Sequence, residues 1–186
     1  MKSIRVFSSP ESMAEEIARH WCEKAKQNAK EELVFTVVLS GGNTASLLYS
    51  KLAQPEWRDQ IPWEIVHIFF ADERCVPPNN YESNYKNIYD ILLKYISIPE
   101  QNIHRIKGEK NPEKEAPRYA NEINDHLSLR KGDTNYFDWV LLGVGVDGHT
   151  ASLFPDQNII TSSKLCETAR HPETGQFRIT LTPYAI

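Results

Sequence analysis

The sequence lacks the features that mark secreted, membrane-spanning and zinc-finger proteins. Its three cysteines, Cys22, Cys75 and Cys166, are odd in number and widely spaced, so they indicate neither a disulfide framework nor a paired zinc spacing. Residues 1–7 lead directly into a polar segment, without the apolar core of a signal peptide. The longest apolar run, residues 139–146, is too short to cross a bilayer. These absences predict a cytoplasmic protein with no membrane partner.

The chain also has fewer basic than acidic residues. The chain has 21 Lys and Arg against 25 Asp and Glu, and a formal net charge of −4 argues against a nucleic-acid or membrane-surface partner. Any phosphate that the protein binds is then expected to be one small group met by local charge. With 186 residues, 40% of them hydrophobic, the chain predicts one domain over residues 1–186, acting as a monomer.

Several catalytic and cofactor signatures are missing as well. The sequence has no GxSxG nucleophile elbow, so a serine-hydrolase mechanism lacks its usual mark. Most histidines show neither HExxH nor Cys/His ligand spacing. The segment SGGNT, residues 40–44, lacks the Lys of a nucleotide P-loop, which argues against a nucleoside triphosphate. We therefore expect no metal and no cofactor.

Apolar runs alternate with polar, amphipathic segments, which predicts strands alternating with helices. Strands are expected at residues 4–7, 33–39, 63–70, 103–106, 137–144, 165–168 and 177–182. Helices are expected at residues 10–30, 45–52, 84–95 and 112–129, the first opened by a capping box of Ser8 with Glu11 and the third capped by Ser83. Because this alternation requires crossover connections, we predict an α/β fold with a Rossmann-like, mostly parallel sheet flanked by helices.

Polar residues follow three of the predicted strands at the point where each strand ends. Ser40, Asp72 and Asp147 occupy these positions. In such folds ligands gather at the carboxyl ends of the strands, where the connecting loops meet. One cleft could therefore hold all three residues.

The segment VLLGVGVDGHTASLFP, residues 140–155, combines an apolar strand with a glycine-rich turn. It delivers Asp147 and His149, and a carboxylate beside an imidazole is suited to proton transfer near neutral pH. A βα turn with a solvated Asp and His is the alternative. The same glycines match GxGxxG, but Asp147 and His149 would intrude on a dinucleotide phosphate, so we disfavour that site.

Two further segments could bind a polar substrate. Small residues at the start of a predicted helix, Gly41, Gly42, Asn43 and Thr44, leave backbone amides open to an anion, although an ordinary tight turn would look the same. Residues 72–85, DERCVPPNNYESNY, place acids beside a cation, which suits a substrate site or a self-neutralising surface cluster. In that segment Asp72, Arg74 and Asn84 are the candidate contacts.

The motifs taken together resemble those of the 6-phosphogluconolactonases, a branch of the glucosamine-6-phosphate isomerase/deaminase superfamily. They are LSGGNT at 39–44, FFADERCVP at 69–77, SNY at 83–85, GVGVDGHTASLFP at 143–155 and RITLT at 178–182. They follow the order of that family and span nearly the whole chain. The resemblance implies hydrolysis of 6-phospho-D-glucono-1,5-lactone to 6-phosphogluconate, in the pentose phosphate pathway, without a metal.

The resemblance also implies roles for individual residues. His149 would activate water and return the proton to the ring oxygen, while Asp147 would orient and polarise its imidazole. Asp72, grouped with this catalytic pair, would hold the substrate together with Arg74. The amides of residues 41–44 would receive the 6-phosphate with Arg178, since a guanidinium matches phosphate bidentately. Taken alone, Arg178 would more commonly be an exposed strand residue.

Two rival functions remain. The deaminase branch of the superfamily carries a catalytic Glu shortly after the Asp-Gly-His turn, where this chain has Phe154, so the lactonase is preferred. Ala45 stands where relatives often have Pro. The chain ends at Ile186, before the helices and strands with which relatives usually continue, and before a basic residue that helps to hold phosphate. A truncated, non-catalytic phosphosugar-binding fragment is therefore the second hypothesis.

Overall fold

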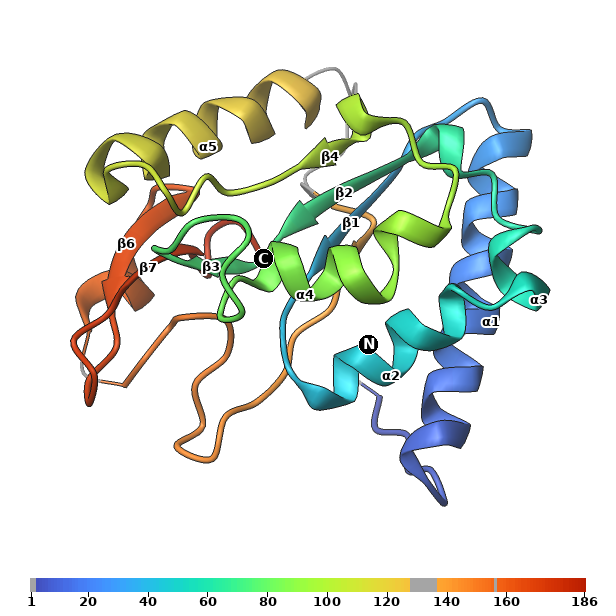
Figure 1. Cartoon of the computed structure of the whole chain (residues 1–186), viewed down its shortest axis with the longest axis horizontal. Helices are drawn as coiled ribbons and strands as arrows, with labels where there is room; N and C mark the ends of the chain where they lie inside the picture. The colour runs from blue at the N-terminus through green and yellow to red at the C-terminus, as the bar shows by residue number, and fades with distance from the viewer. Residues whose placement is uncertain (1–2, 128–136, 156) are drawn as a thin grey trace.

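The computed structural model describes residues 3–127, 137–155 and 157–186, in which strands and helices alternate (Figure 1). In chain order the main elements are α1 (Pro10–Lys30), β1 (Phe35–Leu39), α2 (Asn43–Leu52), α3 (Pro55–Arg58), β2 (Val66–Phe70), β3 (Asp72–Arg74), α4 (Asn84–Ile91), β4 (Ile103–His104), α5 (Pro112–Leu127), β5 (Trp139–Val140), β6 (Cys166–Arg170) and β7 (Phe177–Leu181). Short 3₁₀ turns lie at Trp63–Ile65, Leu93–Tyr95, Glu100–Asn102 and Asn158–Thr161. No helix in these ranges is both long and apolar enough to cross a membrane.

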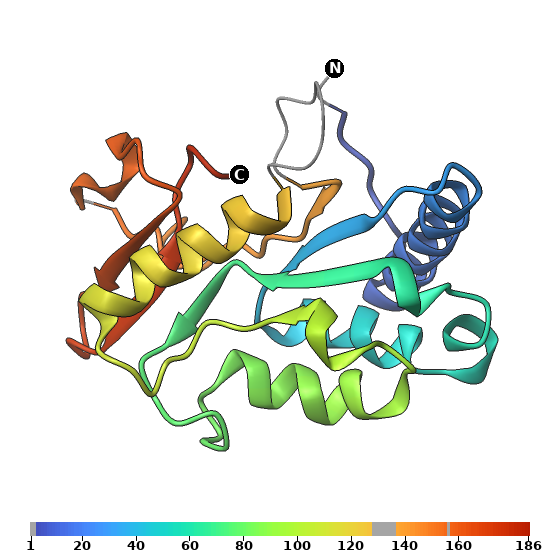
Figure 2. The same ribbon diagram turned by 90° about the horizontal axis from the view of Figure 1, so that it is seen from above.

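The central sheet has four parallel strands in the order β4-β2-β1-β5. All five residues of β1, FTVVL, are buried, as expected for a β-branched strand covered on both faces. Helices α2 and α4 lie on one side of the sheet and α5 on the other (Figure 2). On α1, Trp21 packs edge-on against Phe35 of β1 and Trp139 of β5, with ring centroids 5.6 and 5.7 Å apart. The predicted α/β class with a parallel sheet is confirmed.

A second, antiparallel sheet of three strands, in the order β3-β7-β6, lies beside the first. Only one residue, Ala71, separates β2 from β3, so the chain passes directly from one sheet to the other. The amide of Ala71 donates to the carbonyl of Leu39 in β1, and the carbonyl of Ala71 accepts from the amide of Leu181 in β7, both at 2.8 Å. The sequence predicts no strand at residues 72–74, because the charges there do not show the pattern of a strand. Pairing with distant β7 creates it.

Several predicted boundaries are wrong. Residues 4–7 form no strand, and Ile4 and Val6 are 94% and 91% exposed. The cap of α1 is Ser9, whose hydroxyl accepts from the Ser12 amide at 3.1 Å, rather than Ser8 with Glu11. The strand predicted over 137–144 is reduced to Trp139–Val140, because its neighbour β1 ends at Leu39. Residues 128 and 129 of the predicted fourth helix lie outside the described ranges.

Candidate functional site

One cavity of about 210 Å³ opens where β1, β2 and β5 end. It brings together the segments that follow these three strands, and Ser40, Asp72 and His149 from them line it. The residues that line it are Ser40, Gly41, Gly42, Asp72, Arg74, Asn84, Gly143, Val144, Gly145, His149 and Ala151. The cavity is therefore where a carboxylate, a guanidinium, an imidazole and the start of α2 can meet one small polar ligand.

His149 and Asp147 form a hydrogen-bonded pair in which Nδ1 of the imidazole contacts Oδ1 of the carboxylate. The His149 amide also donates to Oδ1, at 3.3 Å. The hydrogen bond from His149 holds the pKa of Asp147 below its ordinary value, so the carboxylate stays ionised and accepts from an Nδ1–H group. Nε2 is then left with a lone pair that can take a proton.

Glycines allow the turn around this pair to close tightly. Gly148 has φ +85, a left-handed conformation that residues with a Cβ rarely adopt. A Cβ at Gly145 would lie only 2.3 Å from Cε1 of His149 and 2.8 Å from Oδ1 of Asp147. The imidazole therefore occupies the space that a side chain at residue 145 would fill. The imidazole also packs against the buried ring of Phe154, with centroids 4.9 Å apart.

Asp72 connects two other parts of the site. It is 6% exposed, and its Oδ1 accepts from Nδ2 of Asn84 at 3.1 Å while Oδ2 accepts from Oγ of Ser152 at 2.7 Å. Ser152 lies three residues after His149, and its amide donates to Thr180 Oγ1 at 3.2 Å. The carboxylate thus ties the start of α4 to the turn that carries the imidazole. This supports a positioning role for Asp72 alongside the predicted contact with substrate.

Glu73 is buried, and its carboxylate caps the start of α4 instead of lying on the surface. Its carboxylate accepts from the amides of Arg74, Asn84 and Tyr85 at 2.8, 2.8 and 2.9 Å, and from Oγ of Ser83 at 3.0 Å. Burial raises its pKa, against the opposing effect of these donors. The self-neutralising surface cluster considered for residues 72–74 is therefore wrong. By fixing the first turn of α4, Glu73 also fixes Asn84.

Arg74 and Arg178 face each other across β3 and β7, as directly paired residues on the same face of the antiparallel sheet. Nη1 of Arg74 donates to the carbonyl of Glu82. The Nε atoms of both side chains are buried and have no hydrogen-bond partner among the described residues. Burial and the nearby charge of Arg74 lower the pKa of Arg178. Two adjacent guanidinium groups with open donors are suited to an anion.

The start of α2 completes the cavity wall on another side. Gly42 is the N-cap residue, with φ +108 and no side chain to accept from the first helical amides. A Cβ at Gly41 would lie 2.2 Å from Oδ1 of Asn84, so this glycine permits close contact with α4. Asn43 and Thr44 line a neighbouring pocket of about 320 Å³ instead. Four predicted site residues lie outside the lining of the central cavity: Asn43, Thr44, Arg178 and Asp147, the last of which contacts the lining residue His149.

Sequence reasoning missed Ser152 and Gly145 as site residues and Glu73 as a cap. Ser152 was detectable in principle, because it lies in the same TASL segment that follows His149. The close approach of Gly145 to the imidazole depends on how the turn folds back, which no local pattern reports.

Comparison with known proteins gives a consistent assignment. Residues 8–186 match the family model described as glucosamine-6-phosphate isomerases/6-phosphogluconolactonase. The 6-phosphogluconolactonase of Haemophilus influenzae is 43% identical over 146 residues, which are 78% of this chain and 61% of that protein. The chain therefore spans less than two thirds of the length of this relative.

Solved structures agree with this result. A crystal structure titled devB protein superposes with a TM-score of 0.88 at 38% identity, covering 96% of this chain and 73% of that one. The 6-phosphogluconolactonase of Thermotoga maritima gives a TM-score of 0.77 at 31% identity, covering 91% of this chain and 72% of that one. The chain belongs to the glucosamine-6-phosphate isomerase/6-phosphogluconolactonase family.

Proposed function

We propose that the protein hydrolyses 6-phospho-D-glucono-1,5-lactone to 6-phospho-D-gluconate, a reaction of the pentose phosphate pathway, with a water activated by His149. The observation that carries this proposal is the His149–Asp147 pair, which opens onto the same cavity as Arg74 and the start of α2. A base, a cation and open amides around one small cavity suit a phosphorylated ester. The named activities of the relatives point to the same substrate.

In the proposed reaction, Nε2 of His149 takes a proton from water as its oxygen attacks the lactone carbonyl. The tetrahedral intermediate then breaks its bond to the ring oxygen, which receives the proton back from Nε2. Asp147, ionised, holds the ring in orientation and stabilises the imidazolium that forms in between. A lactone is an activated ester, so one positioned water and one general base, worth about 10²–10⁴-fold, account for much of the rate.

The phosphate of the substrate would be held by Arg74 and Arg178 with the amides at the start of α2. The unpaired buried Nε atoms of the two arginines support this assignment, since buried donors are nearly always satisfied. Asp72 and Asn84 would contact the sugar hydroxyls. With a net charge of −4, the protein is proposed to act on this small molecule as a cytoplasmic monomer, without a nucleic-acid or membrane partner.

Turnover of the lactone by the 186-residue chain tests the proposal, after subtraction of the spontaneous hydrolysis in buffer. We expect a rate clearly above buffer, and no release of ammonia from glucosamine 6-phosphate. If 6-phosphogluconate raises the melting temperature while the lactone decays at the buffer rate, the chain is a binding fragment and the catalytic proposal fails. Ammonia release would assign the deaminase activity instead. Phe154, which packs against His149, stands where the deaminases carry a catalytic Glu, and this favours lactone hydrolysis over ammonia release.

Gly145→Ala is expected to lower kcat/KM for the lactone by about 10²-fold, because a misplacement of a catalytic group by about 1 Å costs that much. The new methyl would lie 2.4 Å from Nδ1 of His149 and must push the ring aside. The ring can rotate toward the cavity, so the melting temperature should change little. Steady-state kinetics and a melting curve on the same sample check both parts.

Gly143→Ala is the matched control, in the same loop. A Cβ there meets no atom within 4 Å, and its backbone has no left-handed φ. We expect this variant to lose much less activity than Gly145→Ala. Equal losses in the two variants would show that the loop, and not the position of the imidazole, is what an added methyl disturbs.

A further inference from the structure

Three histidines from three different elements meet where α5 covers the β2–β4 edge of the central sheet, outside the cavity. His67 lies near the amino end of β2, His104 on β4 and His126 in the last turn of α5. One ring nitrogen from each lies within 4.8 Å of the others. The rings pack closely, with centroids 4.1 Å apart for His104 and His126 and 5.3 Å apart for His67 and His104. Three ring nitrogens this close to one another are a candidate ligand set for one metal ion.

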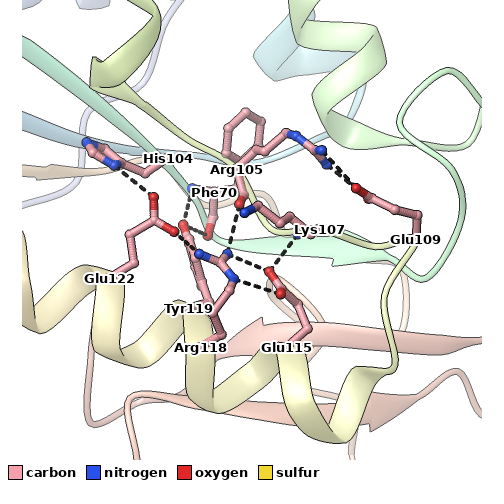
Figure 3. Close-up of polar contacts among 9 residues, drawn as sticks. All are labelled: Phe70, His104, Arg105, Lys107, Glu109, Glu115, Arg118, Tyr119 and Glu122. Carbon is pink, nitrogen blue, oxygen red and sulfur yellow. Dashed lines mark hydrogen bonds and ion pairs between the residues drawn. The ribbon is translucent and has the colours of Figure 1, made fainter.

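A chain of charged groups fixes the central ring. His104 is buried, and its Nδ1 lies 3.1 Å from Oε1 of Glu122. Arg118 holds the other oxygen of Glu122 and also pairs with buried Glu115 (Figure 3). In metal sites a ligating histidine commonly donates its second N–H to a carboxylate in this way, which fixes the tautomer and the orientation of the ring. Nε2 of His104 is thereby left with its lone pair directed at His67.

His67 and His126 can each offer a ring nitrogen to an ion bound at Nε2 of His104. Nδ1 of His67 lies 3.0 Å from Nε2 of His104, a distance at which His67 donates a hydrogen bond when no ion is present. His126 is exposed and has no hydrogen-bond or ion-pair partner in the described ranges. Moving the His67 proton from Nδ1 to Nε2 would free the third lone pair without a change in charge.

We propose that His67, His104 and His126 form a binding site for a divalent transition metal of the zinc class, separate from the cavity of the proposed reaction. Three imidazole nitrogens suit zinc and not magnesium or calcium, which prefer oxygen ligands. Because His126 is exposed, water completes the coordination. The ion ties β2, β4 and α5 together, so it stabilises the folded chain by binding it in preference to the unfolded chain. His67 and His104 are 37 residues apart and His104 and His126 are 22 apart, spacings that match no metal-ligand motif, so the sequence alone does not indicate the site.

Titration of the chelator-treated chain with zinc alone, by calorimetry at pH 7, tests the site. We expect one saturable equivalent and a higher melting temperature with zinc. His126→Ala should weaken binding by more than about 100-fold, because a change to the supporting carboxylate alone, Glu122→Gln, is expected to cost about 10–100-fold. His126 is exposed, so its alanine variant should melt at the wild-type temperature without zinc. This comparison separates lost binding from lost folding.

Two control variants locate the ion. His149→Ala removes the cavity imidazole and should keep the zinc equivalent, and His20→Ala, on the exposed face of α1, should keep it as well. Absence of a saturable equivalent, unchanged affinity in His126→Ala, or loss of the equivalent in His149→Ala would each overturn the proposal. None of these outcomes depends on lactone turnover, so the site and the proposed reaction stand or fall separately.

Discussion

Replacing His149 with alanine is expected to lower kcat for lactone hydrolysis by roughly 10²–10⁴-fold, the usual contribution of a general base. The imidazole lines the cavity, and its hydrogen bond to ionised Asp147 leaves Nε2 as the basic atom. Removing it takes away the proton acceptor but leaves Arg74 and the start of α2 in place. The affinity for 6-phosphogluconate should therefore stay within a few-fold of wild type. Initial rates corrected for spontaneous hydrolysis, with a binding titration, measure the two effects.

His171→Ala is the matched control for this experiment. Its ring packs on Phe154 with centroids 5.1 Å apart, so His149 and His171 share a packing partner. His171 is absent from the lining of the cavity. We expect its alanine variant to keep most of the activity. Full turnover by the His149 variant would remove the proposed mechanism, and equal losses in both variants would show that packing around Phe154 is responsible.

Tyr119→Phe is expected to reduce the free energy of unfolding by about 2–6 kcal/mol, because it leaves two buried backbone groups without a partner at about 1–3 kcal/mol each. The hydroxyl accepts from the amide of Phe70 at 2.8 Å and donates to the carbonyl of Phe70 at 3.1 Å. Tyr119 is fully buried on α5, and burial raises its pKa well above the ordinary value, so it keeps the proton that it donates. It therefore completes the hydrogen bonding at the end of β2 (Figure 3).

Two other tyrosines calibrate this effect. Tyr49 is also buried, but its hydroxyl donates a single hydrogen bond, to the Ser40 carbonyl at 2.6 Å, so Tyr49→Phe should cost about 1–3 kcal/mol. Tyr81 is 82% exposed, and Tyr81→Phe should change stability by less than about 0.5 kcal/mol. Urea unfolding of the three variants gives the order directly. A cost at Tyr119 no larger than that at Tyr81 would contradict the assigned role.

Predictions from sequence succeeded where local patterns carry the information. The five buried residues of β1 and the cap of α4 at Ser83 follow from apolar runs and cap residues, and the structure confirms both. Predictions failed where a distant partner decides. The charged residues of β3 become a strand because β7, more than 100 residues away, pairs with them, and the strand at β5 is short because β1 ends beside it.

By itself the sequence determined the fold class and the candidate imidazole–carboxylate pair, because periodic burial and the Asp-Gly-His turn are local properties of the chain. Only the tertiary structure decided that Asp72 is held by Asn84 and Ser152, that Glu73 caps α4, and that Arg74 lies opposite Arg178. The tertiary structure also decided that three histidines far apart in sequence have ring nitrogens within 4.8 Å of one another. Such contacts arise when separate elements pack on a common sheet, and no spacing along the chain encodes them.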